Sequence, residues 1–389
     1  MTDLLLKNIR VVLPDEEIEN GSLLISNGKI ARINGEENVS AGILDLQGAR
    51  LFPGFIDIHI HGAVGVDAND ADASGLRRAS EFLAENAVTA WLPSLVPDST
   101  ENYQKSIDAI DELIRTQEAH EPAAARAIGV HYEGPFVSEK QCGALRTRYF
   151  RTFSGEVGLP RISAENAIHL TTLAPEIEGG IELIKKLREE NWIISIGHTR
   201  ADVKTLDAAL SVGARHLTHF FNAMTGLHHR DVGVVGWGLS EENVTFDIIA
   251  DGVHVAPQVL RFAAKTKTPE KTVLISDSVS PAGLGDGEFE IWGEKIAVRS
   301  GKTENERGSI AGSVITMLDA VQMMLKLGFS PVEVSRMASL NPARVLGIEN
   351  EYGSIETGKR ADLTALDADG NVVLTIVGGR VAHSIAETR

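Results

Sequence analysis

The sequence has 389 residues, of which 43% are hydrophobic and 23% charged, a size that suits one barrel and a smaller appended unit. Its formal net charge of −17 disfavours nucleic acid and anionic membranes, so we expect neither as a partner. The one cysteine, Cys142, excludes an intrachain disulfide, and with no signal-peptide pattern and no apolar run of membrane-spanning length we expect a cytoplasmic protein.

Both ends of the chain carry short strand-like runs. Residues 1–52 and 349–389 contain apolar runs separated by Gly, Asn and Asp turn residues, as in "GSLLISNGKIARIN" and "DADGN". We expect these two segments to pair into one small β-sandwich. Residues 53–348 would then form a second, larger domain.

The middle of the chain alternates between apolar runs and amphipathic stretches such as "SGLRRASEFLAEN", in which the apolar residues share one helical face. The eight apolar runs cover residues 55–61, 89–95, 127–134, 168–176, 192–199, 216–222, 244–252 and 272–278. Eight strand–helix repeats in about 300 residues predict an α/β fold, a (β/α)8 TIM-type barrel.

The first of these runs, "FIDIHIH", ends in two histidines, His59 and His61. Residues two apart on a strand point to the same face, so the two imidazoles converge. Alternatively, one histidine belongs to the core and the other faces solvent. Because neutral imidazole is a common metal ligand, we expect both to face a metal ion at the C-terminal mouth of the barrel, where active sites of this fold lie.

Three further candidate ligands, Glu133, His198 and His219, lie within later runs, at or near their C-terminal ends. One carboxylate and two imidazoles are the donor set of a catalytic site with a fourth position for water. Glu133 could instead cap a helix or pair with a cation, and His198 could cap the next helix. His59 and His61 could form a second site in which Glu133 bridges two ions. We expect one or two divalent ions, zinc foremost, with iron, manganese or cobalt as alternatives.

The eighth run ends in Asp277, within "LISDS". A carboxylate beside metal-activated water can accept its proton and pass it to a leaving amine. The alternative for Asp277 is an ion-paired structural aspartate. Its place at a strand end favours the catalytic role.

A dense polar stretch, "HFFNAMTGLHHR", contains Asn222 and ends in Arg230. Arg is suited to bidentate contact with a phosphate, although Arg230 alone could be an ordinary surface residue. Together with Asn222 and His254 it favours a pocket for a small anionic substrate.

At these residues the chain resembles the amidohydrolase superfamily, and within it the N-acetylglucosamine-6-phosphate deacetylase family. The matching segments span nearly the whole chain and include "PGFIDIHIHG", "HYEGPF", "IGHTRAD", "THFFNAM", "HHRDVGVVG", "IADGVHV", "LISDSVSPAGLGDGEF", "GSIAGS" and "NPARVLGI". The fourth run, "LTTLAPE", lacks the carboxylated Lys that bridges the metals in related amidohydrolases, and Glu133 would replace it.

The resemblance implies a metal-dependent hydrolase that converts N-acetylglucosamine 6-phosphate to glucosamine 6-phosphate and acetate. It implies Glu133, His198 and His219 as main metal ligands and Asp277 as general base and then acid. The substrate contacts it implies are Ala144, Leu145, Asn222, Ala223, Arg230 and His254, and the backbone of Ile310, Ala311 and Gly312. It also implies a homodimer in which Arg230 reaches the phosphate in the neighbouring subunit's site.

One loop departs from the family pattern. Where the family has a histidine near the acetyl carbonyl, "KQCGALRTRYF" places Leu145, which cannot donate a hydrogen bond. A related amidohydrolase acting on another N-acyl amino-sugar phosphate or another amide is therefore the alternative function. A binding protein without activity is a third interpretation, which the presence of all five candidate ligands disfavours.

Overall fold

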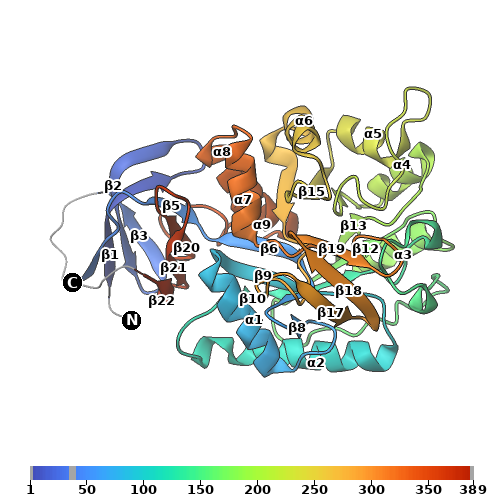
Figure 1. Cartoon of the computed structure of the whole chain (residues 1–389), viewed down its shortest axis with the longest axis horizontal. Helices are drawn as coiled ribbons and strands as arrows, with labels where there is room; N and C mark the ends of the chain where they lie inside the picture. Colours follow the sequence, from blue (N-terminus) through green and yellow to red (C-terminus); the bar gives the residue numbers. More distant parts are fainter. Residues whose placement is uncertain (1–2, 35–40, 386–389) are drawn as a thin grey trace.

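The computed structural model describes residues 3–34 and 41–385 (Figure 1). The barrel and the smaller sheet lie at opposite ends of the long axis of the molecule, and the first and last strands of the described chain both belong to the small sheet. None of the helices in the described part is both long and apolar enough to cross a membrane.

The predicted (β/α)8 barrel is confirmed, and each of its parallel strands coincides with one predicted run to within a few residues. Its eight strands are β6 (Phe55–Ile60), β9 (Val88–Leu95), β11 (Gly129–Glu133), β12 (Ile168–Leu173), β13 (Ile193–Ile196), β14 (His216–Leu217), β15 (Thr245–Ile249) and β16 (Thr272–Ile275). A short extra strand, β10 (Arg126–Ala127), pairs with β9. The barrel closes between its last and first strands, because the Asp277 amide donates to the His59 carbonyl (2.9 Å) and the His61 amide to the Ser278 carbonyl (2.8 Å).

Helices connect the strands and cover the outside of the barrel. They are α1 (Ala73–Glu85), α2 (Thr100–Thr116), α3 (Gly180–Glu189), α4 (Val203–Ser211), α5 (Gly233–Ser240), α6 (Pro257–Lys267), α7 (Met317–Lys326), α8 (Pro331–Ser335) and α9 (Asn341–Leu346). In α1, Asp72 accepts a hydrogen bond from the Gly75 amide at the N-terminus, and Leu76 and Leu83 are buried on one face. The apolar periodicity therefore orients the helix toward the strands.

The two ends of the chain form one mostly antiparallel sheet, bent around its own apolar core. Its strands are β1 (Leu4–Val12), β2 (Glu17–Ser26), β3 (Lys29–Ile33), β4 (Gly42–Asp45), β5 (Arg50–Pro53), β20 (Leu363–Leu366), β21 (Val372–Val377) and β22 (Arg380–Ser384). The N-terminal and C-terminal parts meet where β5 pairs with β20, with Leu51 opposite Ala365. The predicted pairing of the chain ends is therefore confirmed.

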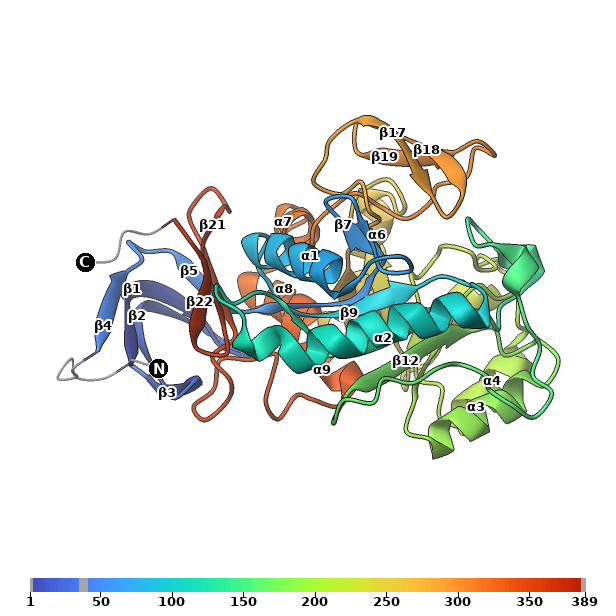
Figure 2. The ribbon, with the colours of Figure 1, turned by 90° about the horizontal axis from the view of Figure 1, so that it is seen from below.

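A three-stranded antiparallel sheet follows the eighth barrel strand, and the sequence analysis did not anticipate it. It consists of β17 (Gly287–Ile291), β18 (Glu294–Arg299) and β19 (Lys302–Asn305). Figure 2 shows it as a separate layer beside the barrel, near β7 (Gly62–Ala63). We call it the inserted sheet.

Candidate metal centre

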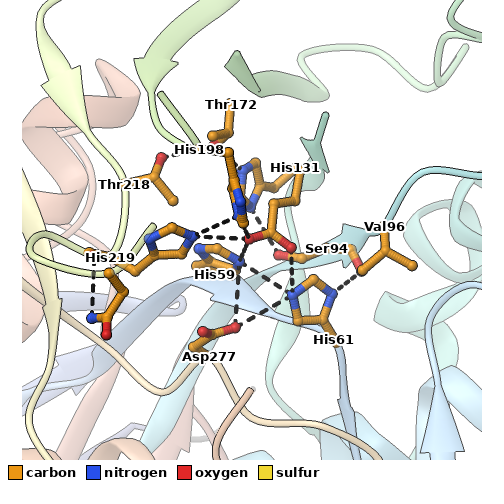
Figure 3. A network of polar contacts seen from close by, with 12 residues as sticks. His59, His61, Ser94, Val96, His131, Thr172, His198, Thr218, His219 and Asp277 are labelled. Atoms are coloured by element: carbon orange, nitrogen blue, oxygen red, sulfur yellow. Dashed lines mark hydrogen bonds and ion pairs between the residues drawn. The ribbon is translucent and has the colours of Figure 1, made fainter. Parts of the chain in front are cut away.

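Six buried side chains from five barrel strands meet at the C-terminal mouth. They are His59 and His61 (β6), Glu133 (β11), His198 (after β13), His219 (after β14) and Asp277 (after β16). Figure 3 shows the four imidazoles and the Asp277 carboxylate directed toward one centre. The alternating side-chain direction in β6 brings both of its histidines to this centre, as their spacing predicts.

Three of these residues have left-handed backbone conformations. The φ angles are 47° at His198, 31° at His219 and 49° at Asp277, and each residue lies two positions beyond the end of its strand. Such conformations in residues other than glycine cost on the order of 1–3 kcal/mol each and concentrate at functional sites. The backbone is thus strained where it turns these side chains into the mouth.

Glu133 contacts two of the histidines with one carboxylate oxygen. Its Oε1 lies 3.0 Å from His198 Nε2 and 3.1 Å from His219 Nε2, and these two nitrogens are 3.0 Å apart. The three donor atoms lie close enough to one another to hold a single ion.

A second group shares the same carboxylate. His59 Nε2 and His61 Nε2 are 3.2 Å apart, and Asp277 Oδ1 lies 3.5 and 3.3 Å from them. The other oxygen of Glu133, Oε2, lies 3.3 Å from His61 Nε2. Glu133 therefore stands between the two groups, as a bridging ligand would.

The hydrogen bonds of the other ring nitrogens fit a metal site. His61 Nδ1 donates to the Ser94 carbonyl (3.0 Å), and His198 Nδ1 donates to the Gln141 carbonyl (2.7 Å). With the proton held on Nδ1, Nε2 presents its lone pair toward carboxylate oxygens, an arrangement that needs a cation between them. The donor chemistry is therefore that of a site for a divalent ion.

The pKa values of the site residues show the same need for positive charge beside the two carboxylates. Burial alone would lower the pKa of His61, but hydrogen bonds to Asp277 and Glu133 raise it to about 10. Burial would raise the pKa of Glu133, but the charge of His59 and hydrogen bonds to His198 and His219 hold it well below its ordinary value. The pKa of Asp277 is likewise lowered against burial, by His59 and His61, so both groups are carboxylates at neutral pH.

Buried polar residues support the ligands from below. The Asp57 carboxylate accepts hydrogen bonds from Ser276 Oγ (2.5 Å) and the His59 amide (3.3 Å), which ties β6 to β16. His131 lies beside His59, and its Nδ1 is 3.0 Å from Ser94 Oγ. The ligands thus sit on a hydrogen-bonded layer inside the barrel.

A cavity of about 300 Å³ opens above the metal groups. The structure places seven of the nine expected substrate-binding residues on its wall: Ala144, Leu145, Asn222, Ala223, His254, Ile310 and Gly312. His254 is oriented by Asp251, whose Oδ2 lies 2.7 Å from His254 Nδ1. Gly143, Trp292 and Ser309 also line the cavity, and none of them is predicted from the sequence.

Two expected contact residues do not line this cavity in the described part of the chain. The side chain of Ala311 packs in a small apolar cluster with Val279 and Ile291, and the predicted contact from its backbone stays a prediction. Arg230 is exposed in the turn at residues 228–231, where its amide donates to His228 Nδ1 (3.3 Å).

The barrel and its paired metal groups define the class of the protein. The family model described as "Amidohydrolase family" matches residues 50–382, so the chain belongs to the amidohydrolases. The chain is 36% identical over 384 residues to an N-acetylglucosamine-6-phosphate deacetylase of Bacillus subtilis (strain 168), with 97% of each chain covered.

A further relative and a solved structure indicate which amidohydrolase family the chain belongs to. The chain is 32% identical to an N-acetylgalactosamine-6-phosphate deacetylase of Escherichia coli O157:H7, covering 96% of this chain and 97% of the relative. A mutant N-acetyl-D-glucosamine-6-phosphate deacetylase from Mycobacterium smegmatis, solved with N-acetyl-D-glucosamine-6-phosphate, superposes with a TM-score of 0.89 at 28% identity, covering 99% of this chain and 100% of the other. The chain belongs to the N-acetylglucosamine-6-phosphate deacetylase family, as its motifs predict.

Proposed function

We propose that this protein hydrolyses the amide bond of N-acetylglucosamine 6-phosphate to give glucosamine 6-phosphate and acetate. The observation that carries this proposal is the pair of histidine–carboxylate groups that share Glu133 beneath the cavity. The family to which the chain belongs supports the choice of substrate.

The residues that would hold metal are Glu133, His198 and His219 in one group and His59, His61 and Asp277 in the other. A bound divalent cation would supply Lewis acidity, lowering the pKa of water and polarising the amide carbonyl. We propose zinc for this role, with iron, manganese or cobalt as alternatives, because imidazole and carboxylate suit all of them.

Asp277 is the proposed proton carrier. Its lowered pKa keeps it ionised at neutral pH, so it can accept a proton from the attacking water. As the carbon–nitrogen bond breaks, the same carboxyl delivers that proton to the amine nitrogen of the sugar. His59 Nε2 and His61 Nε2 lie 3.5 and 3.3 Å from Asp277 Oδ1, so the carboxylate faces the same point as the two imidazoles.

The polar side of the cavity is the proposed site of the phosphorylated sugar, through Asn222 and His254. The Asn222 amide nitrogen donates to the His219 carbonyl (3.2 Å), which leaves its carbonyl oxygen for a sugar hydroxyl. We propose a homodimer in which Arg230 enters the partner's site. The exposure of Leu227 (57%) and Val232 (42%) beside Arg230 supports an interface at this loop.

A second substrate, N-acetylgalactosamine 6-phosphate, is favoured by one observation, namely the Escherichia coli relative at 32% identity. The two sugars differ only in the configuration at C4. Acetate release from both, at matched concentrations, decides between them.

The single cysteine, Cys142, supports a cytoplasmic location.

The substitution Asp277→Asn tests the proposed chemistry. It should lower kcat by about 10²–10⁴-fold, because loss of a general base commonly costs that much. Metal analysis and thermal unfolding of the variant serve as controls for ligand loss and misfolding. Turnover like that of the parent would contradict the role of Asp277, whereas no acetate release by the parent from either sugar phosphate would contradict the proposed function.

A further inference from the structure

Trp292 occupies the turn between β17 and β18 of the inserted sheet and lines the cavity. Its ring centroid lies 5.2 Å from that of His61, with the two rings at 79° to each other. Its ring also packs on the apolar cluster that contains Val96 and Leu145. The inserted sheet therefore brings an aromatic side chain directly beside the metal groups.

Two features of Trp292 are unfavourable in themselves. Its φ of 54°, followed by 79° at Gly293, is the left-handed pair that a two-residue hairpin turn requires, and a residue with a large side chain rarely takes that position. Its indole N–H is buried and has no hydrogen-bond partner among the described residues. The turn accounts for the backbone conformation, but a large aromatic residue there with a buried, unpaired N–H at the edge of the cavity points to a role in binding.

The side chains around the cavity divide into two kinds. Ala144, Leu145 and Trp292 form an apolar wall, in contact with the clusters around Val96 and Val279. Asn222, His254 and Ser309 supply polar groups elsewhere on the lining. Because His61 touches both the apolar wall and Asp277, the apolar wall adjoins the place where the amide carbonyl must react.

We propose that Trp292 and Leu145 form the acyl subsite and that the indole ring limits the length of the acyl group. This inference rests on the proposed function, since it names the part of the substrate that this wall receives. The methyl group of an acetyl substituent packs on the ring, and a longer chain meets it. Apolar pockets discriminate one methylene by about 10–200-fold in kcat/KM, which makes the effect measurable.

The experiment compares N-acetyl-, N-propionyl- and N-butyryl-glucosamine 6-phosphate as substrates. In Trp292→Ala the kcat/KM for the butyryl compound relative to the acetyl compound should rise at least tenfold over the parent. Trp292→Phe keeps a ring and removes only the unpaired N–H, so the parent's preference should persist. Phe289→Ala, in β17 of the same sheet but not among the cavity-lining residues of the described chain, is the matched control and should leave the ratio unchanged.

The ratio between acyl groups separates substrate contact from a structural role, because general damage to the site lowers both rates together. An unchanged ratio in a folded, metal-loaded Trp292→Ala overturns the inference, as does an equal change in Phe289→Ala. If Trp292→Ala does not fold, Leu145→Ala tests the same wall from the barrel side, with the same expected rise and the same contrary result. Absence of activity of the parent on the acetyl compound would instead contradict the proposed function.

Discussion

The histidines of the metal centre differ in how their rings are held. His61 and His198 each donate from Nδ1 to a main-chain carbonyl, whereas His59 and His219 have Nδ1 atoms that are buried without a partner among the described residues. A carbonyl partner fixes both tautomer and ring direction. Each group therefore combines one fixed histidine with one whose orientation depends on packing and on the ion.

His169 in β12 is a buried histidine that the site does not use, and it makes stability depend on pH. Its Nε2 accepts a hydrogen bond from the Ile162 amide (3.0 Å). Burial, with a further contribution from Arg161, lowers its pKa to about 4, against about 6.5 in an unfolded chain. Because the folded state binds fewer protons between these values, this stabilisation is complete above about pH 6.5 and is lost as pH falls toward 4.

The expected loss from His169 is on the order of 2–3 kcal/mol over that range. His169→Gln keeps an acceptor for the Ile162 amide but cannot titrate, so its free energy of unfolding should fall less steeply with decreasing pH. Urea unfolding of parent and variant at pH 4.5, 5.5 and 6.5 measures the difference. Parallel pH profiles for the two proteins would contradict this account.

Substitution of Arg230 tests whether this side chain binds the substrate phosphate, as the proposed dimer requires. Arg230→Ala should raise KM strongly for the phosphorylated sugar and hardly at all for its dephosphorylated form, because only the phosphate would be contacted. Steady-state kinetics on the two substrates gives the comparison, and sedimentation velocity shows whether the variant keeps its assembly. Equal effects on both substrates would mean that Arg230 does not bind the phosphate.

At the scale of elements, the closeness of neighbouring barrel strands depends on particular glycines. A Cβ added to Gly129 in β11 would lie 2.1 Å from the Ile168 carbonyl oxygen of β12. Gly129→Ala should therefore push these strands apart and destabilise the protein by about 1–3 kcal/mol. Gly226→Ala is the control, since no described atom lies within 4 Å of its added Cβ, and it should change stability by less than about 0.5 kcal/mol.

Denaturant unfolding of both glycine variants provides the measurement. A midpoint for Gly129→Ala equal to that of Gly226→Ala would show that the strands can accommodate the extra methyl group. Because β11 ends in Glu133, a displaced strand should also weaken metal binding in Gly129→Ala. Metal content at fixed free metal concentration tests this second consequence.

The elements that could be predicted from the sequence are those with a strong local pattern. The eight barrel strands are apolar runs, and their ends carry the histidines and carboxylates that meet at the mouth. The inserted sheet has a weaker pattern: "GEFEIWGEKIAV" alternates and has Trp-Gly at its turn, but its strands carry Glu and Lys on an exposed face and so lack an apolar run. Trp292, at that turn, is not predicted either.

Which residues reach the cavity is harder to predict than which strands form. Ala311 lies between two cavity-lining residues, Ile310 and Gly312, yet its own side chain packs away from the cavity. The direction of each side chain in such a loop depends on tertiary packing, and no local sequence pattern indicates it. Similarly, no sequence pattern indicates that the Ser94 and Gln141 carbonyls orient His61 and His198.

At the scale of the whole molecule, a bound ion would join strands that are far apart in sequence. The six candidate ligands belong to five of the eight barrel strands, so metal should stabilise the barrel as a unit. A ligand present at 100 times its dissociation constant contributes about 2.7 kcal/mol. Chelation should therefore lower the unfolding temperature and abolish activity, and added metal should restore both.

Thermal unfolding before and after chelation, with metal analysis of each sample, checks this expectation. Chelation of the double variant His59→Gln/His61→Gln should produce a smaller shift, because one of the two groups is already lost. An unchanged unfolding temperature in a sample shown to be free of metal would mean that the ligands contribute to chemistry but not to the stability of the fold.

The pairing of β5 with β20 has a consequence for biosynthesis. Leu51 leaves the ribosome long before its partner Ala365, and at 5–20 residues per second the delay is roughly 15–60 s. In the last part of this interval all six candidate metal ligands have been made, while the edge of β5 that faces away from β1 still has no partner strand. A nascent chain can therefore contain all six candidate metal ligands and still expose an unpaired strand edge. That edge could pair with another nascent chain on the same messenger RNA.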